Sequence, residues 1–83
     1  MQEPTPKTTP GTILTHRLRD AMDESNMTGA ALARATGIQR SEISRYRAGK
    51  VDPRPPTVRR MARALGVSAE WLTGESGDRR AEP

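Results

Sequence analysis

Apolar side chains recur along this chain at intervals of three and four residues, which places them on one face of a helix. The first stripe contains Leu14, Leu18, Ala21 and Met22 and ends near Ser25. Later stripes are shorter, and no segment shows the strict alternation of apolar and polar residues that is typical of a strand. The pattern therefore predicts an all-α protein.

Start and stop signals divide the chain into five short helices. Thr28 and Ser68 are typical N-caps, because a hydroxyl accepts a hydrogen bond from a free N–H of the first turn. Three prolines exclude a continuous helix over residues 50–56. The first helix is expected to begin near Pro10 or Thr12. The others are expected over residues 28–37, 39–48, 56–66 and 68–74.

Three small or apolar residues relate the second predicted helix to the third. Ala33, Gly37 and Ile43 stand four and then six residues apart, which lets two short helices meet steeply around a tight turn. Ala33 permits close approach, and Gly37 can adopt the left-handed conformation that ends a helix. Ile43 returns an apolar side chain to the core. This pattern predicts a helix-turn-helix, whose leading interpretation is sequence-specific binding of duplex DNA.

Charge is concentrated around the same segment. Residues 28–63 hold nine basic and two acidic side chains and carry +7, whereas the rest of the chain carries −3 and the total is +4. Lysine and arginine displace the counterions condensed on phosphates, so this asymmetry favours a polyanionic partner. A solvated arginine-rich surface would give the same composition, and only the overlap with the helix-turn-helix favours the first interpretation.

The sequence offers no chemistry for catalysis, a cofactor or a metal. It contains no cysteine, a single histidine, no carboxylate pair and no glycine-rich phosphate loop. No apolar run approaches the length of a membrane span, and residues 1–10 lack the apolar centre of a signal peptide. We therefore expect a non-enzymatic, cytoplasmic protein.

The predicted organisation is one small domain with polar ends. We expect a flexible N-terminal arm over residues 1–11, the helix-turn-helix domain over 12–74 and a flexible polar tail over 75–83.

Several short motifs occur together in the order of a known family. They are LA at 32–33, G at 37, IS at 43–44, GK at 49–50, a proline loop, and MARALGVSAEWLTGE at 61–75. In this combination the chain resembles the lambda-repressor and Cro type of helix-turn-helix domain, the Xre family, over about residues 12–75. The resemblance implies a compact five-helix lambda-repressor-like domain whose third helix enters the major groove. It also implies a location in the cytoplasm of a bacterial cell or phage-infected host, at the nucleoid.

The resemblance also implies which side chains contact DNA. The expected base-reading residues on and before the third helix are Gln39, Arg40, Ser41, Ser44 and Arg45. Their chemistry is suitable, because arginine donates two hydrogen bonds to guanine and glutamine pairs with adenine. The expected phosphate contacts are Thr28, Arg47, Lys50 and Arg54. For Arg59, Arg60 and Arg63 a solvated helix surface is favoured over a phosphate contact.

The chain departs from the family at two places. Gly29 stands where members often carry a glutamine that holds a phosphate, so backbone N–H groups or Thr28 must replace that contact. Met22 and Arg47 stand where members often pair an arginine with a glutamate. We therefore expect Met22 to fill the core and Arg47 to face solvent or phosphate.

Two functions compete at this stage. The first is a compact transcriptional regulator, in most cases a repressor, that binds a near-palindromic operator as a homodimer. Trp71 and Leu72 would then either close the core or expose a patch for the second subunit. The second is a protein-interaction module that uses the same fold to bind a toxin, an antirepressor or a similar protein partner.

Overall fold

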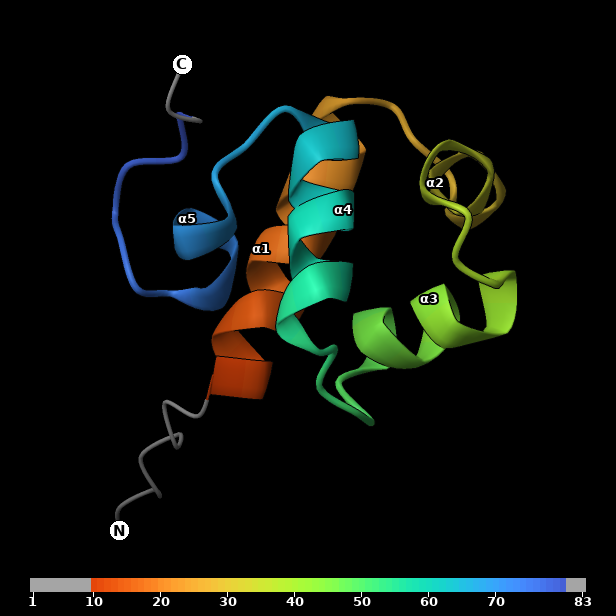
Figure 1. Ribbon diagram of the computed structural model, residues 1–83, viewed down its shortest axis with the longest axis horizontal. Helices are drawn as coiled ribbons and strands as arrows, with labels where there is room; N and C mark the ends of the chain where they lie inside the picture. Colours follow the sequence, from red (N-terminus) through yellow and green to blue (C-terminus); the bar gives the residue numbers. More distant parts are fainter. Residues whose placement is uncertain (1–9, 81–83) are drawn as a thin grey trace, which may run out of the picture.

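The computed structural model describes residues 10–80, which form five helices and no strand (Figure 1). The elements are α1 (Pro10–Glu24), α2 (Gly29–Thr36), α3 (Arg40–Ala48), α4 (Pro55–Leu65) and α5 (Ala69–Thr73). The predicted all-α, five-helix fold is confirmed. Residues 1–9, most of the predicted arm, and residues 81–83 lie outside the described range.

The helix ends follow the predicted signals closely. The hydroxyl of Thr28 accepts from the N–H of Ala31 at 3.0 Å, so Thr28 is the N-cap of α2 as predicted. Gly37 ends α2 in the left-handed conformation, with φ of 78°. α4 begins at Pro55, one residue earlier than predicted, because a proline at the first helical position loses no intrahelical hydrogen bond.

One apolar core joins all five helices. The stripes of α1 and α4 are buried as predicted, and Leu18, Leu32, Ile43, Met61 and Leu72 include the most completely enclosed side chains. Met22 is buried, which confirms its expected role as core filler. Two buried residues between helices, Ile38 and Val67, were not predicted, because neither belongs to a periodic stripe.

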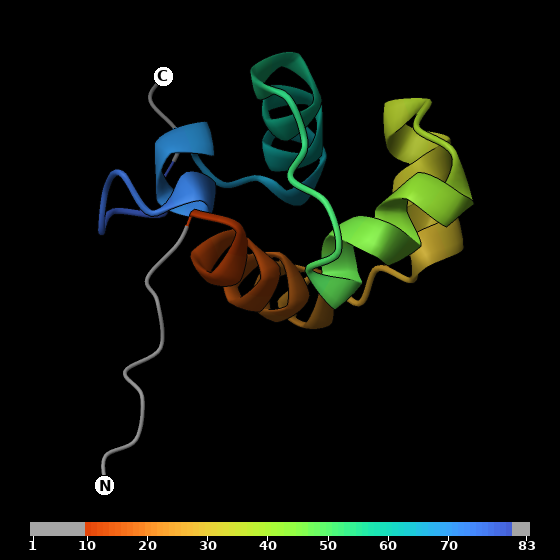
Figure 2. The same cartoon turned by 90° about the horizontal axis from the view of Figure 1, so that it is seen from below.

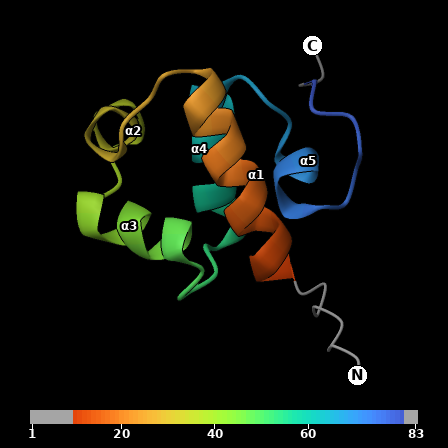
Figure 3. The same ribbon diagram turned by 180° about the vertical axis from the view of Figure 1, so that it is seen from behind.

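The arrangement leaves α3 at one side of the molecule. α1 and α4 overlap at the centre of the view in Figure 1 and lie apart in Figure 2, where α4 is above α1. α5 packs against both, α2 and α3 pack against each other, α3 also packs against α1, and α2 also packs against α4. Figure 3 shows the same order from behind, with α5 and the C-terminal segment on the side away from α2 and α3. α3 therefore receives its support from α1 and α2 and has an outer face without a neighbouring helix.

The described part of the C-terminal segment contacts the domain. Arg79 forms a salt bridge of 2.7 Å with Glu24, and its backbone carbonyl accepts from the N–H of Ser68 at 2.9 Å. The guanidinium carbons of Arg79 and Arg17 lie 4.6 and 4.9 Å from the ring centre of Trp71. Arg17 also donates to the carbonyl oxygens of Trp71 and Ser76. The polar tail was expected to be flexible, and its contacts with the domain were not predicted from the sequence.

The same contacts correct one predicted role. Trp71 is 8% exposed and Leu72 is 0% exposed, and both belong to the core of the single chain. The alternative that Trp71 and Leu72 expose a patch for a second subunit is therefore wrong. Their apolar surface is already covered by α1, by α4 and by the side chains of Arg17 and Arg79.

Candidate nucleic-acid interface

The two sides of α3 differ sharply in environment. Ile43 is 0% exposed and Tyr46 is 8% exposed, and both belong to the core cluster. The polar residues of the helix face outward, and the exposed side chains include all the predicted base-reading residues: Gln39, Arg40, Ser41, Ser44 and Arg45. α3 is therefore held from behind while its outer side is free for a partner.

The turn between α2 and α3 is fixed by hydrogen bonds. The N–H of Gly37 donates to the carbonyl of Ala33 at 2.8 Å. The hydroxyl of Thr36 donates to the carbonyl of Leu32 at 2.7 Å and accepts from the N–H of Ile38 at 3.2 Å. Ile38 is buried, so the turn is also anchored in the core. These contacts set the angle at which α3 is presented.

The first turn of α3 leaves its polar side chains uncommitted to the fold. Gln39 is the N-cap residue of α3, but its side chain makes no capping hydrogen bond. Ser41, Ser44 and Arg45 stand three and four residues apart, so they lie on one side of the helix. Amide, hydroxyl and guanidinium groups on one exposed face can donate to and accept from base edges.

The tyrosine behind this face stays protonated. Burial, followed by the negative charge of Glu42, raises the pKa of Tyr46 above its ordinary value of 10.0, and Arg45 acts in the opposite direction. The neutral phenol therefore supports the back of α3 and adds no charge to the surface that faces a partner.

A hollow of about 540 Å³ lies between the start of α2 and one side of α3. The described residues that line it include no acidic side chain; they are Thr28, Gly29, Ala30, Arg40, Ser41, Ser44 and Arg47. The first N–H groups of a helix form its positive end, and two guanidinium groups add full charges beside it. The hollow is therefore suited to an anion such as a phosphate group.

Arg47 and Gly29 are directly related in this hollow. A Cβ atom added to Gly29 would lie 3.4 Å from a guanidinium nitrogen of Arg47. The Arg47 guanidinium therefore lies beside the start of α2, where a Cβ atom at position 29 would be in contact with it. Sequence reasoning placed the two residues separately and did not find this contact, because they are 18 positions apart in the chain.

Other predicted phosphate contacts lie after α3. Lys50 and Arg54 are exposed, and Arg54 is the N-cap residue of α4. Val51, next to Lys50, is 42% exposed and is the one large apolar side chain exposed among the described residues.

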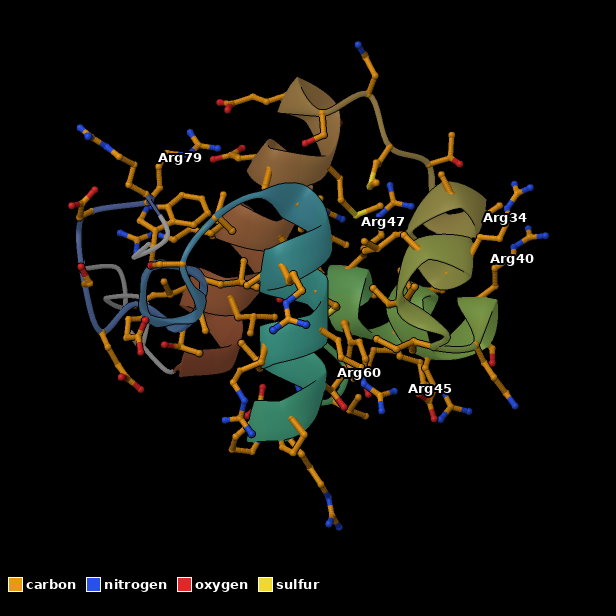
Figure 4. The ribbon with its side chains drawn as sticks, turned by 45° about the horizontal axis from the view of Figure 1, so that its top comes forward. Arg34, Arg40, Arg45, Arg47, Arg60 and Arg79 are labelled. Atoms are coloured by element: carbon orange, nitrogen blue, oxygen red, sulfur yellow. The ribbon has the colours of Figure 1, made fainter. Side chains whose placement is uncertain are left out.

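Arg45 and Arg47 lie on opposite sides of α3 (Figure 4), as expected for two residues that stand two positions apart in a helix.

The described residues contain neither a candidate metal cluster nor a membrane-spanning helix. Within them, no group of three or more histidine, cysteine, aspartate or glutamate side chains could hold a metal ion. None of their helices is long and apolar enough to cross a membrane.

Comparisons with known proteins agree with this geometry. A protein-family model described as helix-turn-helix matches residues 18–72. The fold is similar to that in the crystal structure of a hypothetical transcription factor, NHTF, from Neisseria, with a TM-score of 0.77 and 23% sequence identity. That similarity covers 88% of this chain and 84% of the other. No curated protein sequence matches the chain.

Proposed function

The chain belongs to the helix-turn-helix family of DNA-binding domains, and we propose that it is a sequence-specific transcriptional regulator that reads the major groove of duplex DNA with α3. The family is one of DNA-binding transcription regulators of the Xre type and not of enzymes. The observation that carries the proposal is the division of α3 into a fully buried back, at Ile43, and an exposed polar front. A helix supported in this way fits the major groove, which is about 12 Å wide in B-form DNA.

In this proposal the front of α3 supplies sequence discrimination. Arg45 and Arg40 donate hydrogen bonds to guanine O6 and N7, and Gln39 pairs with adenine. The hydroxyls of Ser41 and Ser44 can donate or accept, so they can contact either base. Each arginine–guanine pair would contribute about 1–3 kcal/mol of discrimination against the wrong base. The exposure of all five side chains supports this assignment.

Phosphate contacts would position α3 in the groove. Arg47 and Thr28 border the hollow at the start of α2, and Lys50 and Arg54 are exposed near the start of α4. Such contacts fix orientation and supply affinity that depends on salt, but they carry no sequence information of their own.

We also propose that the protein acts as a repressor and as a homodimer on a near-palindromic operator. α3 has nine residues and spans about 13 Å at about 1.5 Å per residue, so one copy contacts few base pairs. Two copies on half-sites about one helical turn apart would multiply affinity and specificity. The similar Neisseria protein is named a hypothetical transcription factor, which is consistent with a regulatory role.

The test is selection of bound duplexes from a random pool. The native chain should enrich one motif with two-fold symmetry. Arg45→Ala should lose preference at one base position of each half-site. Arg47→Ala is the matched control, because it removes the same charge from the opposite side of α3 and should weaken all sequences equally. Enrichment of no motif would refute the proposal, and a motif without symmetry would refute the dimer.

A further inference from the structure

α4 carries three arginines that take no part in the DNA contacts proposed above. Arg59, Arg60 and Arg63 are all exposed, and α4 has no acidic residue in its sequence. The salt bridge found among the described residues joins Arg79 to Glu24 and involves none of the three. They therefore form a strongly basic edge of the domain.

This edge borders an open groove of about 510 Å³ between α4 and the end of α2. Its lining consists of the three arginines with Ala35, Thr36, Pro56 and Ala64. None of these described lining residues is acidic, so the groove can accept an anion without competition from a neighbouring carboxylate.

The three arginines are not equivalent. Arg59 and Arg63 also border a hollow that contains Glu70, and Arg59 borders another that contains Glu70 and Glu75. Those carboxylates on and after α5 compete with an external anion for the two guanidinium groups. Of these three hollows, Arg60 borders the groove whose described residues include no carboxylate and neither of the other two. Arg60 is therefore the cation best placed for an external anion.

Arg60 also lies on a definite side of α3. In Figure 4, Arg45 and Arg60 lie on one side of α3, whereas Arg47 lies on the other. The hollow that Arg47 lines is formed by the start of α2, and the groove that Arg60 lines is formed by the end of α2 and by α4. Two anion-accepting surfaces thus flank α3.

Duplex DNA matches this arrangement. A helix that lies in the major groove has a sugar–phosphate backbone on each side, and each backbone carries closely spaced negative charges. We propose that Arg60 binds a phosphate of the strand opposite to the one that Arg47 contacts. The inference rests on the proposed function and extends the interface from α3 onto the body of α4.

The test compares two neighbouring arginines of the same helix. Arg60→Gln and Arg59→Gln each remove one exposed charge, and glutamine is a good helix former, so both variants should fold with native circular dichroism. DNA affinity of each variant and of the native chain is measured between 50 and 200 mM salt on the duplex enriched from the random pool. Arg60→Lys serves as a variant that keeps the charge.

The expected result is specific to Arg60. Arg60→Gln should reduce the magnitude of the slope of log affinity against log salt by about 0.9 for each bound copy. When salt is raised from 50 to 200 mM, the fold-loss of affinity should therefore be about 3.5 times smaller for the variant than for the native chain, per bound copy. Its sequence preference should be unchanged, Arg60→Lys should keep the native slope, and Arg59→Gln should change the slope much less. Equal slopes for the two glutamine variants would overturn the inference.

A second measurement locates the phosphate. Uncharged methylphosphonate groups replace phosphates beside the half-site on one strand at a time. When one strand is substituted, Arg60→Gln should no longer change the affinity for DNA, whereas Arg47→Ala should still reduce it. When the other strand is substituted, the reverse should hold. Loss of both effects on the same strand would refute the opposite-strand assignment. A native chain that binds no preferred duplex would instead refute the proposed function itself.

Discussion

Ile43 and Arg45 are two positions apart in α3, and they lie on opposite faces of the helix, one in the core and one in solvent. Ile43 is 0% exposed and anchors α3 to the core, whereas Arg45 is exposed on the outer side. Replacing each in turn should separate stability from recognition.

The size of the first effect follows from burial. Ile43→Ala removes three buried carbons at about 0.8 kcal/mol each and leaves a cavity, which gives about 3 kcal/mol within the usual range of about 2–5. A chain of 83 residues is expected to have a total stability of only about 4–12 kcal/mol, so this is a large fraction. Arg45→Ala should change the free energy of unfolding by about 0.5 kcal/mol or less.

Urea unfolding followed by circular dichroism measures both effects. With a denaturant slope of about 1 kcal/mol per molar, Ile43→Ala should lower the midpoint by about 3 M, and Ile43→Val by about 0.5–1.5 M. Ile43→Val should keep the native sequence preference on DNA, whereas Arg45→Ala should lose preference at one base position of each half-site without losing stability. A midpoint for Ile43→Ala within about 0.5 M of the native value would refute the anchoring of α3.

Three further outcomes are expected. Ser68→Ala should cost about 1 kcal/mol in thermal unfolding, because the Ser68 hydroxyl accepts from the N–H of Trp71 at 2.9 Å and caps α5; an unchanged midpoint would contradict this. The raised pKa of Tyr46 means that the unfolded chain loses this proton first, so the contribution to stability is complete below pH 10 and declines as the pH rises through the folded pKa. Urea midpoints measured from pH 8 to 11 should therefore fall more steeply for the native chain than for Tyr46→Phe, and parallel curves would exclude the effect. The exposed pair of Glu24 and Arg79 should show a coupling of at most about 1 kcal/mol in a double-mutant cycle, and a larger value would show that the pair is desolvated.

The helices could be predicted from sequence because their signals are local. The stripe of Val58, Met61, Ala62 and Leu65 repeats at the period of a helix, and all four side chains are buried in the structure. N-caps and left-handed glycines act within four residues of the helix end they define, so they too are visible in sequence.

Contacts between polar residues far apart in the chain could not be predicted in this way. Arg79 and Glu24 are 55 positions apart, and no periodic pattern relates a polar tail to the end of α1. The position of Arg60 on one side of α3 likewise depends on how α4 packs. In sequence, Arg59, Arg60 and Arg63 look alike, and only packing beside Glu70 and beside α2 separates them.

The outward face of α3 was predictable from the inward direction of Ile43, and the exposure of Gln39, Arg40 and Arg45 follows from it. Their assignment to particular bases stays a prediction, since it depends on contacts with DNA.

The placement of Arg17 and Arg79 over Trp71 has a practical consequence. Trp71 is the single tryptophan of the chain, so ultraviolet excitation at the red edge of protein absorption selects one indole. Its ring is covered by one guanidinium from α1 and one from the C-terminal segment. Intrinsic fluorescence therefore gives a label-free optical signal for detachment of that segment, one that originates away from the surface that α3 presents.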